Sequence, residues 1–270
     1  MEKIKKKIGL IGVGNMGTAI LEGLLKKKLI AGSQTVVYDK ITEKAAAFTK
    51  RWKAVRASSN GELVKKSDIV ILAVKPQDLQ HTAQEMAGVW KKKQVLISIL
   101  AGMPLAQLRK AAGPVPKLIR AMPNLGAKAG ESITAITGPD KSALAAAESI
   151  FSGCGKVLRL EEKHFDLVTA LSGSGPAYFF LLMEMLAEEG VKRGLSREQA
   201  RLLAVQTGVG AGLLAQSALE SPAELRVMVT SKGGTTEAAL KVMEESSIRK
   251  IFSEAIAAAH RRGAELSKGA

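Results

Sequence analysis

The stretch IGLIGVGNMGTAI occupies Ile8–Ile20 and decides the fold of the first half of the chain. An apolar run over Lys7–Gly12 predicts a short buried strand, and helical spacing over Thr18–Lys28 predicts the helix that follows it. A G-x-G-x-x-G element joins the two and consists of Gly12, Val13, Gly14, Asn15, Met16 and Gly17. In this strand–turn–helix context, such an element is typical of a dinucleotide-binding site.

Each glycine of the element has a separate physical role. Gly12 permits the tight turn, Gly14 lets a pyrophosphate approach the backbone, and Gly17 lets the helix pack closely on the strand. The free amides and the positive end of the helix then face the phosphates. An ordinary glycine-rich turn is the alternative interpretation, and the strand–helix context favours cofactor binding over it.

An acid at the end of the second predicted strand, Val36–Tyr38, bears on the choice of cofactor. Asp39 follows the last glycine of the element by about 20 residues, the spacing at which a carboxylate accepts hydrogen bonds from the adenosine ribose. This favours NADH and repels the 2′-phosphate of NADPH. Lys40 is the next residue and would act in the opposite direction, so both cofactors stay open.

Further apolar runs bounded by polar or turn residues extend the pattern. A helix is expected over Thr42–Trp52, and more strands over Ile69–Val74, Val95–Ile99, Lys117–Met122, Ile133–Thr137 and Lys156–Leu160. Buried runs separated by helices indicate a parallel sheet covered on both faces. The predicted fold class is therefore α/β, with an N-terminal Rossmann-type domain over residues 1–160.

Beyond residue 160 the pattern changes to long helices. They are expected over Pro176–Arg193, Arg201–Ala218, Thr235–Glu245 and Ile248–Leu266, and Ser196 is expected to cap the N-terminus of one of them. Apolar side chains on the first of these helices are too many for one small helical domain to bury. Residues 161–270 are therefore predicted to form an all-helical dimerisation domain.

Composition narrows the class of protein. The formal net charge is +15, but the basic residues are dispersed and there are only six Phe, two Tyr and two Trp, so no nucleic-acid partner is expected. The single cysteine, Cys154, fits a reducing, cytoplasmic compartment. The three histidines lie far apart, so no metal site is expected. We found no run of about 20 apolar residues and expect no membrane span.

Five motifs give the chain a resemblance to pyrroline-5-carboxylate reductases from Lys7 to about Glu245. They are IGLIGVGNMGTAI at 8–20, AVKPQ at 73–77, IRAMPN at 119–124, LSGSGPAY at 171–178 and VTSKGGTTEAAL at 229–240. The last two are the specific ones, because the first occurs in many dehydrogenases. The resemblance implies a dinucleotide domain followed by a helical domain that interlocks with a partner subunit, in a dimer or a ring of dimers.

The resemblance also implies site residues. NADPH or NADH would contact the G-x-G-x-x-G element from Gly12 to Met16, together with Asn60 and the turn formed by Ala73, Val74, Lys75 and Pro76. Ala101 and Gly102 would lie close to the nicotinamide. The expected activity is NAD(P)H-dependent reduction of 1-pyrroline-5-carboxylate to L-proline.

The segment from Ser231 to Thr236 is the expected substrate site. Gly233 and Gly234 precede Thr235 and Thr236 at a predicted helix start, where free amides can hold a carboxylate. A simple helix cap would explain the threonines but leaves the paired glycines unexplained. The resemblance implies that Thr236 is the catalytic residue and hydrogen-bonds the ring nitrogen of the substrate.

Several positions depart from the family pattern. Leu125 and Gly126 stand where Thr-Pro is usual, Arg226 and Val227 where Lys-Asp is usual, and Lys232 where Pro is usual. Because these positions flank the expected substrate pocket, two other interpretations stay open. One is a reductase of another cyclic imine or a related hydroxyacid-type dehydrogenase, and the other is a non-catalytic dinucleotide-binding sensor.

Overall fold

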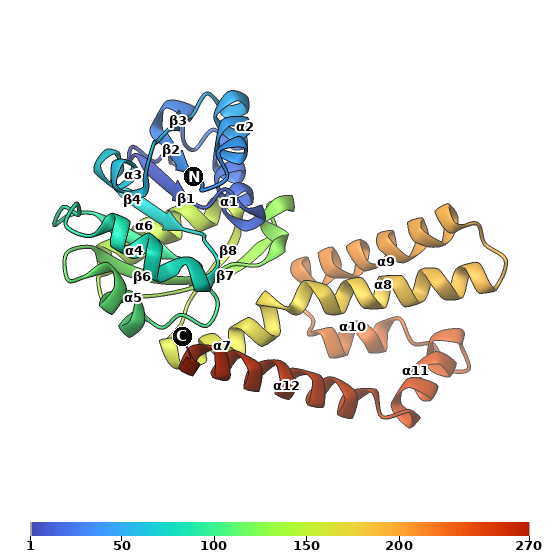
Figure 1. The fold of residues 1–270 in the computed structure, drawn as a ribbon. Coiled ribbons are helices and arrows are strands. Elements are labelled where there is room, and N and C mark those ends of the chain that lie inside the picture. The colour runs from blue at the N-terminus through green and yellow to red at the C-terminus, as the bar shows by residue number, and fades with distance from the viewer. Residues whose placement is uncertain (1, 270) are drawn as a thin grey trace. The chain divides into compact units, whose positions relative to one another are not determined.

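An eight-stranded sheet organises the first part of the chain in the computed structural model, which describes residues 2–269 (Figure 1). The strands are β1 Ile8–Ile11, β2 Thr35–Tyr38, β3 Val55–Arg56, β4 Ile69–Leu72, β5 Val95–Ser98, β6 Lys117–Met122, β7 Ser132–Thr137 and β8 Gly155–Arg159. Their order in the sheet is β3-β2-β1-β4-β5-β6-β7-β8. The predicted Rossmann-type α/β class is confirmed.

One strand pair departs from the expected parallel arrangement. β7 runs antiparallel to β6, with Arg120 opposite Thr137 and Met122 opposite Ala135, whereas every other neighbouring pair is parallel. The reason is the connection between them: the short helix η3 (Leu125–Ala129) is too short for the crossover that parallel neighbours need. The sheet is therefore mixed, and the prediction of an all-parallel sheet was wrong at this pair.

Helices cover both faces of the sheet. The helices of this part are α1 Asn15–Lys26, α2 Thr42–Trp52, α3 Asn60–Lys66, α4 Leu79–Met86, α5 Leu105–Ala112 and α6 Lys141–Phe151. Side chains of α1, α2 and α6 share one apolar cluster with Ile8, Leu10 and Ile71, and side chains of α3, α4 and α5 share another with Ile11 and Leu72. Successive side chains of a strand point to opposite faces of the sheet, so each face of this sheet has its own apolar core.

Helices make up the rest of the chain. They are α7 Phe165–Val168, α8 Gly175–Lys192, α9 Arg197–Ser217, α10 Pro222–Met228, α11 Thr235–Glu245 and α12 Ile248–Gly269. Besides η3, short helical segments occur in both parts of the chain. They are η1 Gly32–Gln34, η2 Pro76–Asp78, η4 Ser152–Cys154, η5 Glu162–His164 and the π-helical η6 Thr169–Gly173. Ser196 caps α9 as predicted, because its hydroxyl accepts the Gln199 amide while the Gln199 side chain accepts the Ser196 amide.

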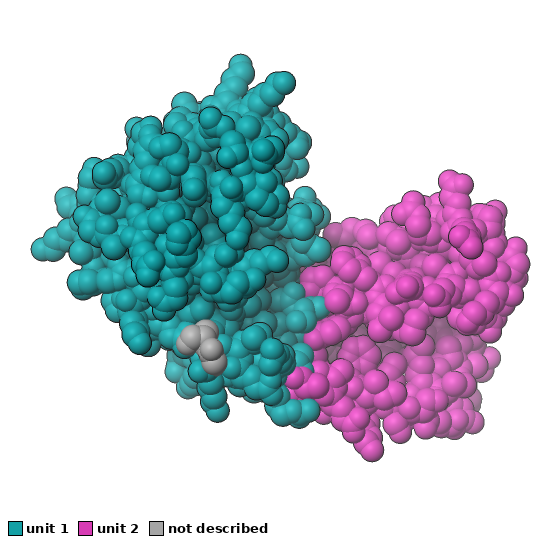
Figure 2. All heavy atoms as spheres, viewed as in Figure 1, with its two compact units in different colours: residues 1–174, 259–270 teal, residues 175–258 magenta. Residues whose placement is uncertain are grey.

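The chain divides into two compact units (Figure 2). One comprises residues 1–174 with 259–270 and contains the sheet, and the other comprises residues 175–258. The helical unit leaves large apolar side chains exposed. On α8 and α9 they include Phe179, Phe180, Leu186, Leu202 and Leu213, each more than half exposed.

One helical stretch bears on the expectation of no membrane span. The continuous helical stretch Glu162–Lys192 is 31 residues long, with a mean hydropathy of 1.2 in its most apolar window. By length and composition alone it could cross a membrane. One such helix is weak evidence for a membrane, and exposed apolar side chains also suit a protein interface.

Candidate active site

A cleft opens where the strand order reverses. The chain passes from β1 to β2 and β3 on one side, and then returns to place β4 on the other side of β1. Ligands of such sheets bind outside the carboxyl ends of the strands at this point. Gly12 follows β1 and Ala73 follows β4, and the Ala73 amide donates to the Ile11 carbonyl at 2.8 Å. The cleft beside them has a volume of about 450 Å³.

Predicted cofactor residues from four separate segments line this cleft together. They are Gly12, Gly14, Asp39, Asn60, Ala73, Val74 and Lys75. Of the other predicted residues, Pro76 begins η2 directly after Lys75. Val13 and Asn15 line a second hollow, beside α1, and Met16 packs against the core below the sheet.

The three glycines of the G-x-G-x-x-G element differ in their surroundings. Gly12 has a φ of +93°, and a Cβ there would lie 2.6 Å from the Ala73 carbonyl oxygen. A Cβ on Gly17 would lie 2.6 Å from the Gly12 carbonyl oxygen, so α1 packs too closely for a side chain. Gly14 is the N-cap of α1, without a side-chain cap, and a Cβ there would meet no atom of the chain within 4 Å. Gly14 therefore borders open space beside unsatisfied helix amides.

Asp39 is held in place by the backbone around it. Its Oδ2 accepts the Val13 amide at 2.7 Å, and its Oδ1 accepts the Ile41 amide at 2.8 Å. The carboxylate is thereby attached to the glycine-rich turn itself. This link between β2 and the turn after β1 fixes the acid at the end of the cleft.

Asn60 supplies a buried acceptor with no partner. The residue is 5% exposed, and its Nδ2 donates to Oε2 of Glu85 at 2.5 Å. Its Oδ1 is buried and accepts no hydrogen bond from the described residues. A buried amide oxygen left this way costs free energy unless a donor from outside the chain reaches it.

Ala101 and Gly102 lie on the turn after β5, at the same edge of the sheet as the cleft. β5 pairs with β4, with Ser98 opposite Leu72. Gly102 is buried with a φ of +66°, and a Cβ there would lie 2.8 Å from the Cβ of Leu266. The end of α12 therefore packs on this turn and requires glycine there. Neither residue lines the cleft itself.

The Ser231–Thr236 segment lies in the helical unit. The Gly234 amide donates to the Ser231 carbonyl at 3.0 Å, and Gly234 is the N-cap of α11 without a side-chain cap. Gly233 has a φ of +72°, which explains why glycine is needed there. Its amide donates to Oε2 of Glu237 at 2.7 Å. Thr235 is exposed and Thr236 half-buried, both in the first turn of α11.

Sequence reasoning missed several polar residues at these sites. In the cleft they are Tyr38, Asp78, His81 and Glu85, and beside the substrate segment Glu237. Asp78, His81 and Glu85 share one helical region, which follows the turn after β4. The predicted strand over Ile69–Val74 ends at Leu72, and the helical segment that begins at Pro76 was not predicted, although a proline at the first helical position is a start signal. A helix placed after that turn would have indicated that its first residues reach the cleft.

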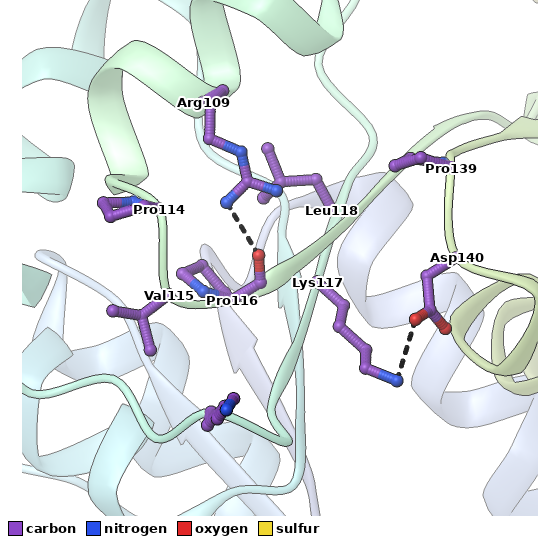
Figure 3. A pocket seen from close by; sticks show the side chains of 9 residues that line it. Arg109, Pro114, Val115, Pro116, Lys117, Leu118, Pro139 and Asp140 are labelled. Atoms are coloured by element: carbon purple, nitrogen blue, oxygen red, sulfur yellow. Dashed lines mark hydrogen bonds and ion pairs between the residues drawn. The ribbon is translucent and has the colours of Figure 1, made fainter.

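A separate hollow opens at the opposite edge of the sheet, beside the start of β6 (Figure 3). Arg109, Lys117 and Asp140 of this hollow are already engaged by the chain. Arg109 donates to the carbonyls of Gly113 and Pro116, and Nζ of Lys117 lies 2.9 Å from Oδ2 of Asp140. These contacts hold the loop before β6. The remaining charged group is the exposed side chain of Lys92, and a single exposed lysine does not define a binding site, so we assign no site here.

Two family models match the chain. Residues 162–266 match the model described as pyrroline-5-carboxylate reductase dimerisation, and residues 7–102 match the one described as NADP oxidoreductase, coenzyme F420-dependent. The first covers most of the helical part of the chain. The second covers β1 to the Ala101–Gly102 turn, and so includes every predicted cofactor residue.

Relatives extend the match to almost the whole chain. Pyrroline-5-carboxylate reductases of Pseudomonas aeruginosa and Synechocystis are 38% and 39% identical to it, over 97% of this chain and 97% and 98% of theirs. The solved reductase of Coxiella burnetii superposes with a TM-score of 0.89 at 34% identity, covering 98% of this chain and 99% of that one. A Plasmodium falciparum pyrroline carboxylate reductase with NADP bound gives 0.88 at 28% identity, over 98% and 99%. The chain therefore belongs to the pyrroline-5-carboxylate reductase family.

Proposed function

We propose that this chain reduces 1-pyrroline-5-carboxylate to L-proline with NAD(P)H. The observation that carries the proposal is the extent of the match: relatives named for this activity align with 97% of the chain, including both the cleft and the Ser231–Thr236 segment. The dinucleotide-binding part is proposed to be residues 1–160. The dimerisation and substrate part is proposed to be residues 161–270.

The cleft fits a dinucleotide on three grounds. Gly14 borders open space at the uncapped start of α1, where backbone amides can receive a pyrophosphate. Asp39 is fixed at the end of β2, where a carboxylate can accept ribose hydroxyls. The orphaned Oδ1 of Asn60 offers an acceptor to a donor of the cofactor. We propose that these residues hold NADPH or NADH, with Ala101 and Gly102 near the nicotinamide.

For the substrate we propose the first turn of α11. The amides that follow Gly234 have no side-chain cap, so they can hold the carboxylate of 1-pyrroline-5-carboxylate. Glycine at 233 and 234 lets the backbone approach the ligand. Ser231 and Thr235 complete the segment, and Thr236 orients the ring nitrogen.

In this reaction the main task of the protein is to position the substrate against the cofactor. When bound, NAD(P)H supplies the hydride. The imine carbon is already electrophilic, and a protonated imine carries its own proton into the product amine, so no side chain has to supply one. The chain must hold the ring close to the cofactor, at about 3–3.5 Å, and exclude water. This accounts for a proposed substrate segment, Ser231–Thr236, that contains no histidine, cysteine or carboxylate to act as a general acid.

The helical unit is proposed to assemble with a second copy of the chain. Its exposed Phe179, Phe180 and Leu186 lie within the match to the dimerisation family model. A subunit interface would cover these side chains, and it also accounts for the apolar stretch Glu162–Lys192 without a membrane. We propose a cytoplasmic homodimer or ring of dimers. Sedimentation at micromolar concentration tests this, and an active monomer would contradict it.

The departure at residues 125–126 favours one alternative. The Gly126 amide donates to Oδ1 of Asn124 at 3.1 Å, and a Cβ at Gly126 would lie 2.6 Å from the Glu131 carbonyl oxygen. Proline has no amide hydrogen to make this bond, so the loop after β6 here is built differently from the usual Thr-Pro form. If that loop borders the substrate, a reductase of another cyclic imine is the second candidate.

One assay separates these possibilities. Oxidation of NADH and NADPH is followed with 1-pyrroline-5-carboxylate and, in parallel, with its six-membered analogue. Faster turnover of the five-membered ring is expected. Faster turnover of the larger ring would replace the proposal by the second candidate. Cofactor binding without turnover of either ring would identify a dinucleotide sensor.

A further inference from the structure

An ion pair joins two of the segments that line the cleft. Nζ of Lys40 lies 3.0 Å from Oδ1 and 3.1 Å from Oδ2 of Asp78. Lys40 follows β2 and Asp78 ends η2, so the pair joins segments that leave two different strands. Both residues line the same cleft as Asp39.

Lys40 follows Asp39 directly in the sequence, so the Lys40–Asp78 ion pair bears on the choice between NADH and NADPH. An acid at the end of β2 accepts the ribose hydroxyls of NADH, whereas a nearby cation accommodates the 2′-phosphate of NADPH. This chain has both residues in succession. Asp39 is fixed by the Val13 and Ile41 amides. The preference between the two cofactors therefore depends on whether Lys40 is available to pair with the 2′-phosphate.

Lys40 is engaged by Asp78. A 2′-phosphate could pair with Lys40 only by breaking the bidentate contact with Asp78, and it would also approach the carboxylate of Asp39. NADH has no such phosphate and leaves the pair intact. The side chain of Lys40 is 71% exposed and that of Asp78 is 31% exposed, so the pair can exchange without disturbing the core.

We infer that Asp78 is a specificity-determining residue: by holding Lys40 on the opposite side of the cleft, it disfavours NADPH relative to NADH. The inference rests on the proposed function, since it concerns the same cleft. Asp78 acts through Lys40 and does not have to touch the cofactor.

The test compares the two cofactors in Asp78→Asn. This substitution keeps the shape of the side chain and removes its charge. It is expected to raise the NADPH/NADH ratio of kcat/KM by about three- to tenfold, the strength of one exposed charge contact. Lys40→Met is expected to lower the same ratio. In the double variant, removal of the Asp78 charge should give no gain, because the lysine that it would release is gone.

Lys44 also lines the cleft. The effect of a change in overall charge on NADPH binding must therefore be separated from the effect of releasing Lys40. Glu148→Gln is the matched control: Glu148 pairs with Arg159 outside the cleft, and its loss changes the net charge by the same amount. The control should leave the cofactor ratio unchanged. An equal rise in the control, or in the Lys40→Met background, would overturn the inference, and so would an unchanged ratio in Asp78→Asn.

Binding of NADH and NADPH without substrate, followed by cofactor fluorescence, is measured for every variant. If neither cofactor binds the unmodified chain, the proposed function fails. If both bind and their ratio does not respond to Asp78→Asn, only the inference about Asp78 fails.

Discussion

Nη1 of Arg120 lies 3.1 Å from Oε1 of Glu162, and only 4% of the Arg120 side chain is exposed. Arg120 belongs to β6 and Glu162 to η5, the first element after the sheet. The same Oε1 accepts the Leu105 amide at 2.7 Å, at the start of α5. The guanidinium also lies 4.8 Å from the ring centroid of Phe165. One carboxylate therefore joins three segments around a buried cation.

Removal of Glu162 should destabilise the fold. Glu162→Ala would leave the buried Arg120 charge with the more distant Asp166, at 3.8 Å, as its acidic neighbour. We expect a loss of about 2–3 kcal/mol in the free energy of unfolding, since an unpaired buried charge is costly. Urea unfolding at a fixed protein concentration measures it. The adjacent, exposed Glu161→Ala should change the free energy of unfolding by less than about 1 kcal/mol. Equal changes in the free energy of unfolding of the two variants would show that the Arg120–Glu162 pair is no more important for stability than an exposed glutamate.

Gly14→Val should separate cofactor binding from folding. The valine side chain would enter space free of other atoms of the chain, so the melting temperature should stay close to that of the unmodified protein. The same side chain would take the place proposed for the pyrophosphate, and dinucleotide binding should be lost. Calorimetric titration with NADH measures this loss. Normal NADH affinity in the folded variant would exclude the proposed position of the pyrophosphate.

Gly17→Val is the comparison for that experiment. At Gly17 a Cβ already lies 2.6 Å from the Gly12 carbonyl oxygen, so a larger side chain must push α1 away from β1. We expect a lowered melting temperature here and an unchanged one for Gly14→Val. Similar melting temperatures in the two variants would contradict the different surroundings of the two glycines.

The sheet could be predicted from the sequence because its signal is local. Apolar runs such as Lys117–Met122 become strands when both faces are covered, and β6 has these bounds in the structure. Thr42–Trp52 and Thr235–Glu245 are likewise helices with the predicted ends. In these segments the periodicity of apolar side chains and the flanking polar residues indicate the same element with the same ends.

Long-range contacts could not be predicted in this way. Lys40 and Asp78 are separated by 38 positions, and Arg120 and Glu162 by 42. A charged residue next to a strand does not reveal which partner it meets, because that depends on the strand order and on the path of the loops. For this reason the sequence left the roles of Asp39 and Lys40 in conflict, and the position of Asp78 supplies the means of separating them.

Cys154 should make stability depend on alkaline pH. Burial raises the pKa of its thiol from 9.0 to about 11, and the side chain is 1% exposed. The folded state then holds the proton more tightly than the unfolded state. Its stabilising contribution is complete below pH 9 and is lost as the pH rises to about 11, by at most about 3 kcal/mol.

Unfolding of Cys154→Ala over the same pH range provides the comparison. Lysine and tyrosine titration is common to both proteins, so only the slope due to the thiol should differ. The small cavity left by alanine shifts stability by a constant amount. Parallel curves for the two proteins between pH 9 and 11 would contradict a raised thiol pKa.

Thr236→Ala should lower turnover by roughly ten- to a thousandfold, the usual cost of one oriented hydrogen bond at a reacting centre. The hydroxyl is proposed to orient the imine nitrogen and to donate a hydrogen bond to the lone pair that forms on this nitrogen as the hydride is transferred. The iminium nitrogen has no lone pair, so this donated hydrogen bond arises only as the nitrogen becomes an amine, which makes it a contact of the transition state. Cofactor affinity should barely change, because the proposed dinucleotide site lies in residues 1–160.

A helix cap is the competing role for Thr236. Gly234 is the N-cap of α11, and the Thr236 hydroxyl forms no hydrogen bond within the described residues 2–269, so the structure gives no support to capping. A cap would be worth about 1 kcal/mol of stability and little turnover. Thr236→Ser keeps the hydroxyl and should recover much of the rate, while both variants keep a near-normal melting temperature. Turnover and melting temperature are measured together on the two variants. Near-normal turnover with a lowered melting temperature in Thr236→Ala would remove Thr236 from the active site.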